Sequence, residues 1–95
     1  MHLITLKEWS SEDVLQVVEQ SLALKNDPQR YTESLSGRSI ALLFQKTSTR
    51  TRCAAEIGAA QLGAHALYLD WQNTNFGLAD LGDEFRVLSS YTDFI

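Results

Sequence analysis

Two short apolar runs, separated by a segment long enough for a helix, constrain the fold of this chain most. SIALLF occupies residues 39–44 and HALYLD occupies residues 65–70. Continuous apolar runs of this length are typical of strands in parallel sheets, which are covered on both faces. Helical patterns precede, separate and follow them, and TDFI at residues 92–95 resembles the start of a third strand. The alternation predicts an α/β fold, in which a parallel sheet carries flanking helices on right-handed crossovers.

The helices are predicted from capping residues and apolar spacing. Ser10 or Ser11 can cap the first helix, which ends near Pro28. The second begins near Ser48 or Thr49 and stops before Gly63, a residue type that commonly ends helices. Its buried stripe is predicted from three apolar residues, with the cysteine as a small core residue: Cys53, Ile57 and Ala60.

The third helix is predicted from four apolar residues that follow a polar loop, and its acidic first turn suits the helix dipole. The four residues are Leu78, Leu81, Phe85 and Leu88.

Length and composition indicate one small soluble domain. The chain has 95 residues, of which 44% are hydrophobic and 21% charged. Its longest apolar run, residues 40–44, is far too short to cross a bilayer, and the amino-terminal residues do not resemble a secretory signal. Cys53 is the single cysteine, which fits a reducing compartment. We therefore expect a cytoplasmic protein with no membrane partner.

The charge distribution is uneven. The net charge is −4, yet residues 34–55 contain no acid and four basic residues: Arg38, Lys46, Arg50 and Arg52. The remainder carries four basic residues against twelve acidic ones. A basic point on an acidic body suits a small anion, whereas nucleic acid requires a broad basic face. We therefore expect no nucleic-acid partner.

Two predicted loops, residues 45–49 and 71–77, leave the carboxyl ends of the predicted strands, where parallel sheets bind ligands. The first loop leads into a helix start, whose free N–H groups and dipole favour phosphate. Ser48, Thr49 and Thr51 add hydroxyl donors, and Arg50 adds a planar fork that can grip two phosphate oxygens. Cations at this end of a helix oppose its dipole unless an anion is bound. An anion site, a solvated helix start and a basic recognition tag all remain open from these residues alone.

A family resemblance favours the anion site. Residues 44–52, FQKTSTRTR, resemble the Phe-x-Lys-x-Ser-Thr-Arg-Thr-Arg motif of the ornithine carbamoyltransferases, and the last five are shared with the aspartate carbamoyltransferases. AEIGAAQLGAHALYLD and DEFRVLSSYTDFI are similar to the helices and strands that follow in that family. The resemblance covers roughly residues 35–95. It implies a carbamoyl phosphate-binding domain of the three-layer, doubly wound type.

The resemblance also implies a reaction and its binding residues. Carbamoyl phosphate would bind four residues: Ser48, Thr49, Arg50 and Thr51. Arg50 and backbone amides would hold the phosphate, and Thr51 would lie near the carbamoyl carbonyl. Arg52 also matches the motif and ranks below these four as a binding residue, because its spacing from Glu56 favours a role in orienting the helix. An amine, most often that of ornithine, would attack the carbamoyl carbon and release phosphate, giving citrulline for arginine biosynthesis. This chemistry needs positioning and charge stabilisation, with no cofactor and no metal.

The second loop departs from the ornithine-type pattern. It contains no basic residue and has Leu78-Ala79-Asp80 where a polar run is expected. Asn75 is the nearest match to the segment that reaches the neighbouring subunit's site in the family. The family is typically trimeric, so we expect a homo-oligomer.

The family's His-Pro-x-x-Gln segment and amino-acid-binding domain would lie beyond Ile95. We therefore expect residues 1–95 to form a single, incomplete carbamoyl phosphate-binding domain that is inactive by itself. Two alternatives remain: a non-catalytic anion-binding or interaction domain with this fold, and a fragment of an aspartate-type enzyme.

Overall fold

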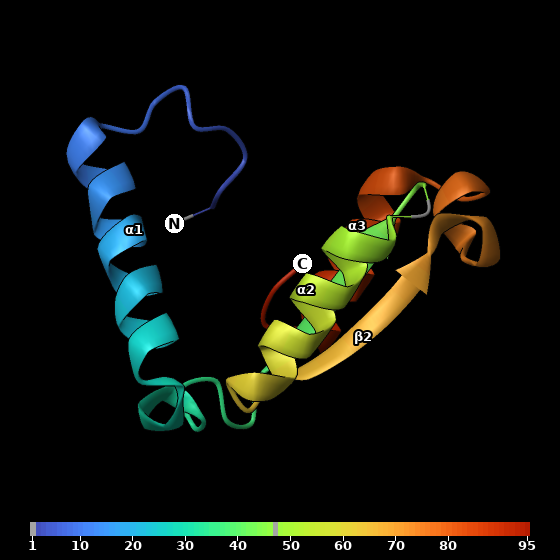
Figure 1. The fold of residues 1–95 in the computed structure, drawn as a ribbon. Helices are drawn as coiled ribbons and strands as arrows, with labels where there is room; N and C mark the ends of the chain where they lie inside the picture. Colours follow the sequence, from blue (N-terminus) through green and yellow to red (C-terminus); the bar gives the residue numbers. More distant parts are fainter. Residues whose placement is uncertain (1, 47) are drawn as a thin grey trace. The chain divides into compact units, whose positions relative to one another are not determined.

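The computed structural model describes residues 2–46 and 48–95, which fall into two compact units (Figure 1). The first unit extends to Tyr31 and contains helix α1, Ser11–Asn26, followed by a short 3-10 helix, η1, at Pro28–Tyr31. The second unit, Thr32–Ile95, contains the sheet and the other helices. Among the described residues, no helix has both the length and the apolar character needed to cross a membrane.

The cap of α1 is Ser10. Its hydroxyl accepts a hydrogen bond from the Asp13 N–H at 3.1 Å, and the Asp13 carboxylate accepts one from the Ser10 N–H at 2.9 Å. This reciprocal capping box satisfies two backbone donors at the helix start. Asp27 caps the other end, where its N–H bonds to the Ala23 carbonyl at 3.1 Å. The predicted bounds of the first helix are confirmed.

The sheet has two parallel strands at the predicted positions, β1 at Ser39–Phe44 and β2 at His65–Asp70. Their register runs from Ser39 opposite His65 to Phe44 opposite Asp70. The other edge of β1 pairs with Phe94 through a parallel bridge at Ile40, and the Ala41 N–H bonds to the Phe94 carbonyl at 2.9 Å. The predicted third strand is thus represented by a single bridge beside β1, and β1 has hydrogen-bonded neighbours on both edges.

Helices cover both faces of this sheet. Helix α2, Thr49–Gln61, lies against the face that carries Tyr68, whereas α3, Leu81–Tyr91, and the 3-10 helix η3, Asn75–Gly77, cover the opposite face. The core on that opposite face contains three buried residues and three partly buried ones: Ala41, Phe76 and Leu88, with Leu43, Leu69 and Trp71. The order of layers is helix, sheet, helix, and the predicted α/β class is confirmed.

The predicted buried stripe of α2 is wrong. Cys53 and Ala60 are exposed, and the Ile57 side chain is 56% exposed. The helix instead buries Ala59, with Ala55 half-buried one turn earlier. Both stripes are apolar at helical spacing, so periodicity does not distinguish them. Small alanine side chains allow α2 to approach the sheet closely, and this packing selects the alanine stripe.

The predicted start of the third helix is also wrong. Leu78 is 88% exposed and precedes α3, which begins at Leu81 after the cap residue Asp80. The Asp80 carboxylate accepts a hydrogen bond from the Asp83 N–H at 2.9 Å, so capping chemistry places the boundary. Phe76, within the predicted polar loop, occupies the core position instead and is 6% exposed.

Candidate functional site

The candidate site lies at the carboxyl edge of the sheet. β1 and β2 end side by side at the Phe44–Asp70 pair, so the segments that follow them leave the same edge (Figure 1). One leads into α2, and the other forms two 3-10 helices, η2 at Trp71–Asn73 and then η3. Thr47, in the first predicted loop, is outside the described residues. The two predicted loops are therefore neighbours, as parallel topology requires.

The amino end of α2 presents backbone donors. Ser48 is the cap residue, and the first intrahelical hydrogen bond runs from the Arg52 N–H to the Ser48 carbonyl at 2.9 Å. The N–H groups of Thr49, Arg50 and Thr51 therefore precede the helical ladder. The Ser48 hydroxyl makes no capping hydrogen bond with the described residues. Within residues 2–46 and 48–95, no backbone carbonyl accepts a hydrogen bond from these three N–H groups, so they can face a ligand.

The other two α-helices begin differently. The hydroxyl of Ser10 caps α1 and the carboxylate of Asp80 caps α3, and both helices have acids in their first turns. The first turn of α2 contains no acid and contains Arg50. Positive charge in that position opposes the helix dipole, whereas a bound anion would favour it.

The basic residues near this helix start differ in their contacts. The guanidinium of Arg52 pairs with the Glu56 carboxylate, Nε to Oε2, at 3.4 Å, and lies over the Tyr68 ring. In the part of the chain that the structure describes, Arg50 and Lys46 form no ion pair with a carboxylate. Arg50 is exposed, as are Thr49 and Thr51. Arg50 is therefore the arginine whose charge is free to meet an anion.

The neighbouring loop is held by its own polar groups. The Asp70 carboxylate accepts hydrogen bonds from the Gln72 N–H at 3.0 Å and from the Asn73 side-chain amide at 3.1 Å. The Thr74 hydroxyl donates to the Trp71 carbonyl at 3.0 Å. These contacts fix the turn and engage the Asp70 carboxylate within it.

Asn75 lies in this neighbouring loop with an exposed side chain. Its backbone carbonyl accepts hydrogen bonds from the N–H groups of Leu78 at 3.0 Å and Ala79 at 2.9 Å. Across the described ranges, no hydrogen bond or ion pair joins Asn75 to residues 48–52. The structure thus brings Ser48, Thr49, Arg50, Thr51 and Arg52 together in one helical turn and leaves Asn75 in the adjacent segment.

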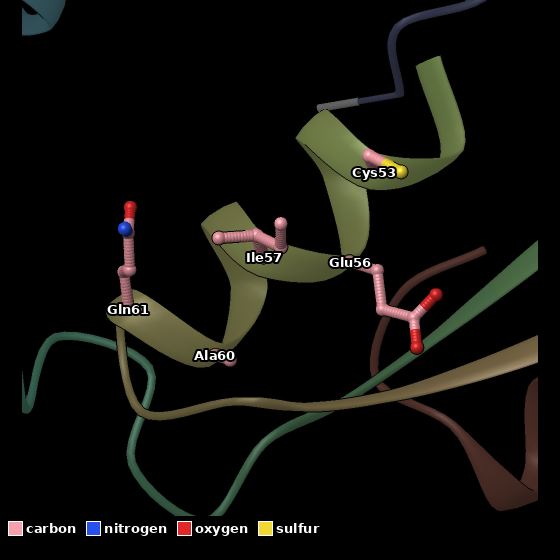
Figure 2. Close-up of a pocket in the computed structure, with 5 residues that line it drawn as sticks. All are labelled: Cys53, Glu56, Ile57, Ala60 and Gln61. Atoms are coloured by element: carbon pink, nitrogen blue, oxygen red, sulfur yellow. The ribbon is translucent and has the colours of Figure 1, made fainter. Parts of the chain in front are cut away.

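A separate depression of about 630 Å³ lies along α2. Its lining residues are shown in Figure 2: Cys53, Glu56, Ile57, Ala60 and Gln61. None of the predicted anion-binding residues lines it, and its one charged residue is acidic. The depression marks the exposed apolar stripe of α2 and offers no group that would attract phosphate.

Tyr68, to which no sequence motif points, lies next to the candidate site. Its ring lies beneath the Arg52 guanidinium, with 3.5 Å between Arg52 Cζ and the ring centroid. The available signal was strand alternation, which places Tyr68 on the same face as Phe44, at the end of β1.

Comparison with known proteins identifies close relatives of this chain. The family model described as the carbamoyl-P binding domain of aspartate/ornithine carbamoyltransferase matches residues 1–95. The ornithine carbamoyltransferase of Anoxybacillus flavithermus is 41% identical over 96 residues, an alignment that covers 97% of this chain and 30% of the relative.

Solved structures give the same result. Ornithine carbamoyltransferase from Pyrococcus furiosus superposes with a TM-score of 0.86 at 35% identity, covering 94% of this chain and 29% of that one. A mutant N-acetyl-L-ornithine transcarbamylase, complexed with carbamyl phosphate and N-succinyl-L-norvaline, superposes with a TM-score of 0.84 at 30% identity. That match covers 98% of this chain and 31% of the other. The chain spans about three tenths of the length of these relatives.

Proposed function

The chain belongs to the aspartate/ornithine carbamoyltransferase family, whose carbamoyl phosphate-binding domain it matches over residues 1–95, and from this we propose that it binds carbamoyl phosphate at the amino end of α2. The observation that carries the proposal is the first turn of α2. There, Ser48 makes no capping bond with described residues, three N–H groups precede the helical ladder, and Arg50 has no carboxylate partner among them. Backbone donors, dipole and guanidinium together suit a phosphate dianion.

Each residue of the turn has a proposed role. The Arg50 guanidinium binds two phosphate oxygens, and the N–H groups of residues 49–51 bind the others. The hydroxyls of Ser48 and Thr49 donate to the same phosphate, and Thr51 donates to the carbamoyl carbonyl oxygen. Polarising that carbonyl and stabilising the departing phosphate would accelerate attack by an amine.

The complete reaction is proposed for the whole transferase, because this chain spans only part of the length of its relatives. Ornithine is the favoured acceptor, since several relatives are named ornithine carbamoyltransferases, and citrulline and phosphate would be the products. We propose that residues 1–95 alone bind carbamoyl phosphate without transferring it. A homotrimer in which Asn75 approaches a neighbouring subunit's site, a cytosolic location and a role in arginine biosynthesis complete the proposal.

A second candidate is a non-catalytic anion-binding domain. The neighbouring loop favours it, since residues 71–80 contain no basic side chain and Asp70, Asn73 and Thr74 are hydrogen-bonded within the turn. Such a domain would bind phosphate as well as carbamoyl phosphate, because no group would recognise the carbamoyl end.

Calorimetric titration of the 95-residue chain with carbamoyl phosphate and with inorganic phosphate tests the proposal. We expect tighter binding of carbamoyl phosphate, because Thr51 engages its carbonyl. Arg50→Ala should weaken that binding at least about tenfold, since it removes a charge-assisted contact.

Arg86→Ala is the matched control. Arg86 is an exposed arginine paired with Asp83 at 2.7 Å in α3, so its loss changes the net charge equally without touching α2. Equal affinity for the two anions would favour the non-catalytic domain. Unchanged affinity in Arg50→Ala would contradict the proposed site.

A further inference from the structure

We propose that Arg52 is a positioning residue which binds no ligand: seated on the Tyr68 ring and paired with Glu56, it fixes the first turn of α2 over the end of β2. The inference rests on the proposed function, since it concerns how the carbamoyl phosphate site is held. The two arginines would then have different roles: Arg50 binds the ligand, and Arg52 contacts the sheet and positions the helix turn.

The contact between Arg52 and Tyr68 is close. The guanidinium carbon lies 3.5 Å from the ring centroid, within the range of a cation–π contact and at stacking distance. The Arg52 side chain is 44% exposed, so more than half of it is covered. A planar guanidinium can stack on a ring in this way, whereas a lysine ammonium cannot present a flat face.

Tyr68 is itself held in place. It pairs with Leu42 across the sheet, and its ring lies 6.0 Å from that of Phe44, tilted by 34°. Phe44 is the last residue of β1 before the segment that leads into the site. The chain of contacts from Phe44 through Tyr68 to Arg52 therefore connects the end of β1, the end of β2 and the start of α2.

Glu56 is the second residue that holds the Arg52 guanidinium in place. Its carboxylate lies 3.4 Å from Arg52 Nε, one turn further along α2. The pair places a negative charge beside Arg52 and offsets its repulsion from the positive end of the helix dipole. Arg50 has no such partner among the described residues, so the uncompensated positive charge of the turn is concentrated on Arg50.

The first test needs no ligand. Tyr68→Leu removes the aromatic face and retains apolar bulk, whereas Tyr68→Phe retains the face and serves as the rescue variant. We expect the ¹H–¹⁵N heteronuclear NOE of residues 49–51 to fall in Tyr68→Leu, because the first turn loses its seat, and to stay at the parent value in Tyr68→Phe. Parent values in both variants would overturn the inference, whatever the chain binds.

The second test measures carbamoyl phosphate affinity well below the melting temperature. Tyr68→Leu and Arg52→Lys should each weaken binding about three- to fivefold, and Tyr68→Phe should leave it unchanged. If Arg52 bound the anion directly and not through its contact with Tyr68, Arg52→Lys would weaken binding while Tyr68→Leu left it unchanged. That result would overturn the inference.

A double-mutant cycle further distinguishes positioning by Arg52 through Tyr68 from direct anion binding by Arg52. The double variant Arg52→Ala/Tyr68→Leu should bind carbamoyl phosphate as tightly as whichever single variant binds it less tightly. Both substitutions remove the same contact, the one between Arg52 and Tyr68. Additive losses would overturn the inference. The proposed function would instead be overturned if the parent chain failed to bind carbamoyl phosphate, or if Arg50→Ala did not weaken binding. The NOE result would then decide by itself whether the contact between Arg52 and Tyr68 positions the first turn of α2.

Discussion

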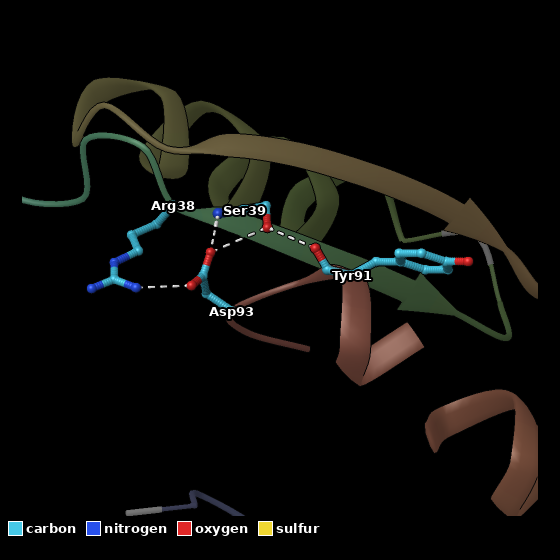
Figure 3. A network of polar contacts seen from close by, with 4 residues as sticks. All are labelled: Arg38, Ser39, Tyr91 and Asp93. Carbon is cyan, nitrogen blue, oxygen red and sulfur yellow. Dashed lines mark hydrogen bonds and ion pairs between the residues drawn. The ribbon is translucent and has the colours of Figure 1, made fainter. Parts of the chain in front are cut away.

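The carboxylate of Asp93 accepts hydrogen bonds from the backbone N–H of Ser39 at 2.8 Å and from the Ser39 hydroxyl at 3.2 Å, as Figure 3 shows. Its other oxygen pairs with the Arg38 guanidinium at 2.9 Å. The Asp93 N–H bonds in return to the Ser39 carbonyl at 3.0 Å. Together these contacts fasten residues 93–94 to the start of β1, beside the bridge between Ile40 and Phe94.

The first prediction concerns the pH dependence of this contact. The Ser39 N–H, and secondly Arg38, hold the pKa of Asp93 below its ordinary value of 3.8. Because the folded state lowers this pKa, the carboxylate's contribution to stability is present above pH 3.8 and is lost as the pH falls through the lowered pKa. Carboxyl ¹³C shifts of Asp93 should therefore titrate below pH 3.8.

Arg38→Gln is the matching variant. It should raise the pKa of Asp93 only partly, since the Ser39 N–H is the larger cause and remains. A return to the ordinary value in Arg38→Gln would show that the ion pair, and not the backbone hydrogen bond, holds the carboxylate ionised.

The second prediction concerns the start of α1. Ser10→Ala removes the hydroxyl that accepts the Asp13 N–H and should reduce helix stability by about 1 kcal/mol. Circular dichroism during thermal unfolding measures the change. Ser11→Ala is the control, because Ser11 is the first residue of the helix and has no part in the capping box. Equal losses in both variants would contradict the assignment of Ser10 as the cap.

The third prediction compares Gly58, within α2, with Gly63, just after the end of α2. Gly63 has a φ of +89°, and an added Cβ would lie 2.7 Å from the Thr32 carbonyl oxygen, so Gly63→Ala should destabilise the fold by about 1–3 kcal/mol. Gly58, within the helix, has open space around the Cβ position. Gly58→Ala should therefore stabilise the fold by about 0.5–1 kcal/mol. Urea unfolding distinguishes them, and shifts of the same sign would refute the turn geometry.

The fourth prediction concerns the core. The Phe76 ring lies 5.6 Å from Trp71 and 5.0 Å from Phe85, centroid to centroid. Phe76→Leu should cost about 1–2 kcal/mol through lost packing and lost aromatic contacts. Leu78→Ala, two residues away at a site that is 88% exposed, should change stability by less than about 0.5 kcal/mol. A larger loss of stability in Leu78→Ala would contradict the position of Leu78 outside the core.

The strands and caps were predictable because their signals are local. The runs 39–44 and 65–70 became strands at the expected residues, and Gly63 ended α2 through a backbone conformation that suits glycine. The face of α2 was not predictable in this way. The stripes that contain Ile57 and Ala59 are both apolar, and only the fit of a helix against a sheet distinguishes them.

The residues of the candidate site were predictable from their motif and from the topological rule that places ligands at the carboxyl edge of a parallel sheet. The role of Arg50 in ligand binding stays a prediction. The Tyr68 seat of Arg52 could not be predicted from sequence spacing, because it depends on which strand lies beneath the first turn of α2. The burial of Phe76 in the core was not predicted, because Phe76 lies within a polar stretch of the sequence.

The bonds between Ser39 and Asp93, which are 54 residues apart, have a consequence for biosynthesis. A ribosome adding about 5–20 residues per second needs roughly 3–11 s to make that interval. During this time β1 has already been synthesised, yet one side of it has no neighbour to hydrogen-bond. An unpaired strand edge attracts other chains. Until residues 93–94 emerge, the nascent polypeptide therefore leaves this edge of β1 open to pairing with other chains.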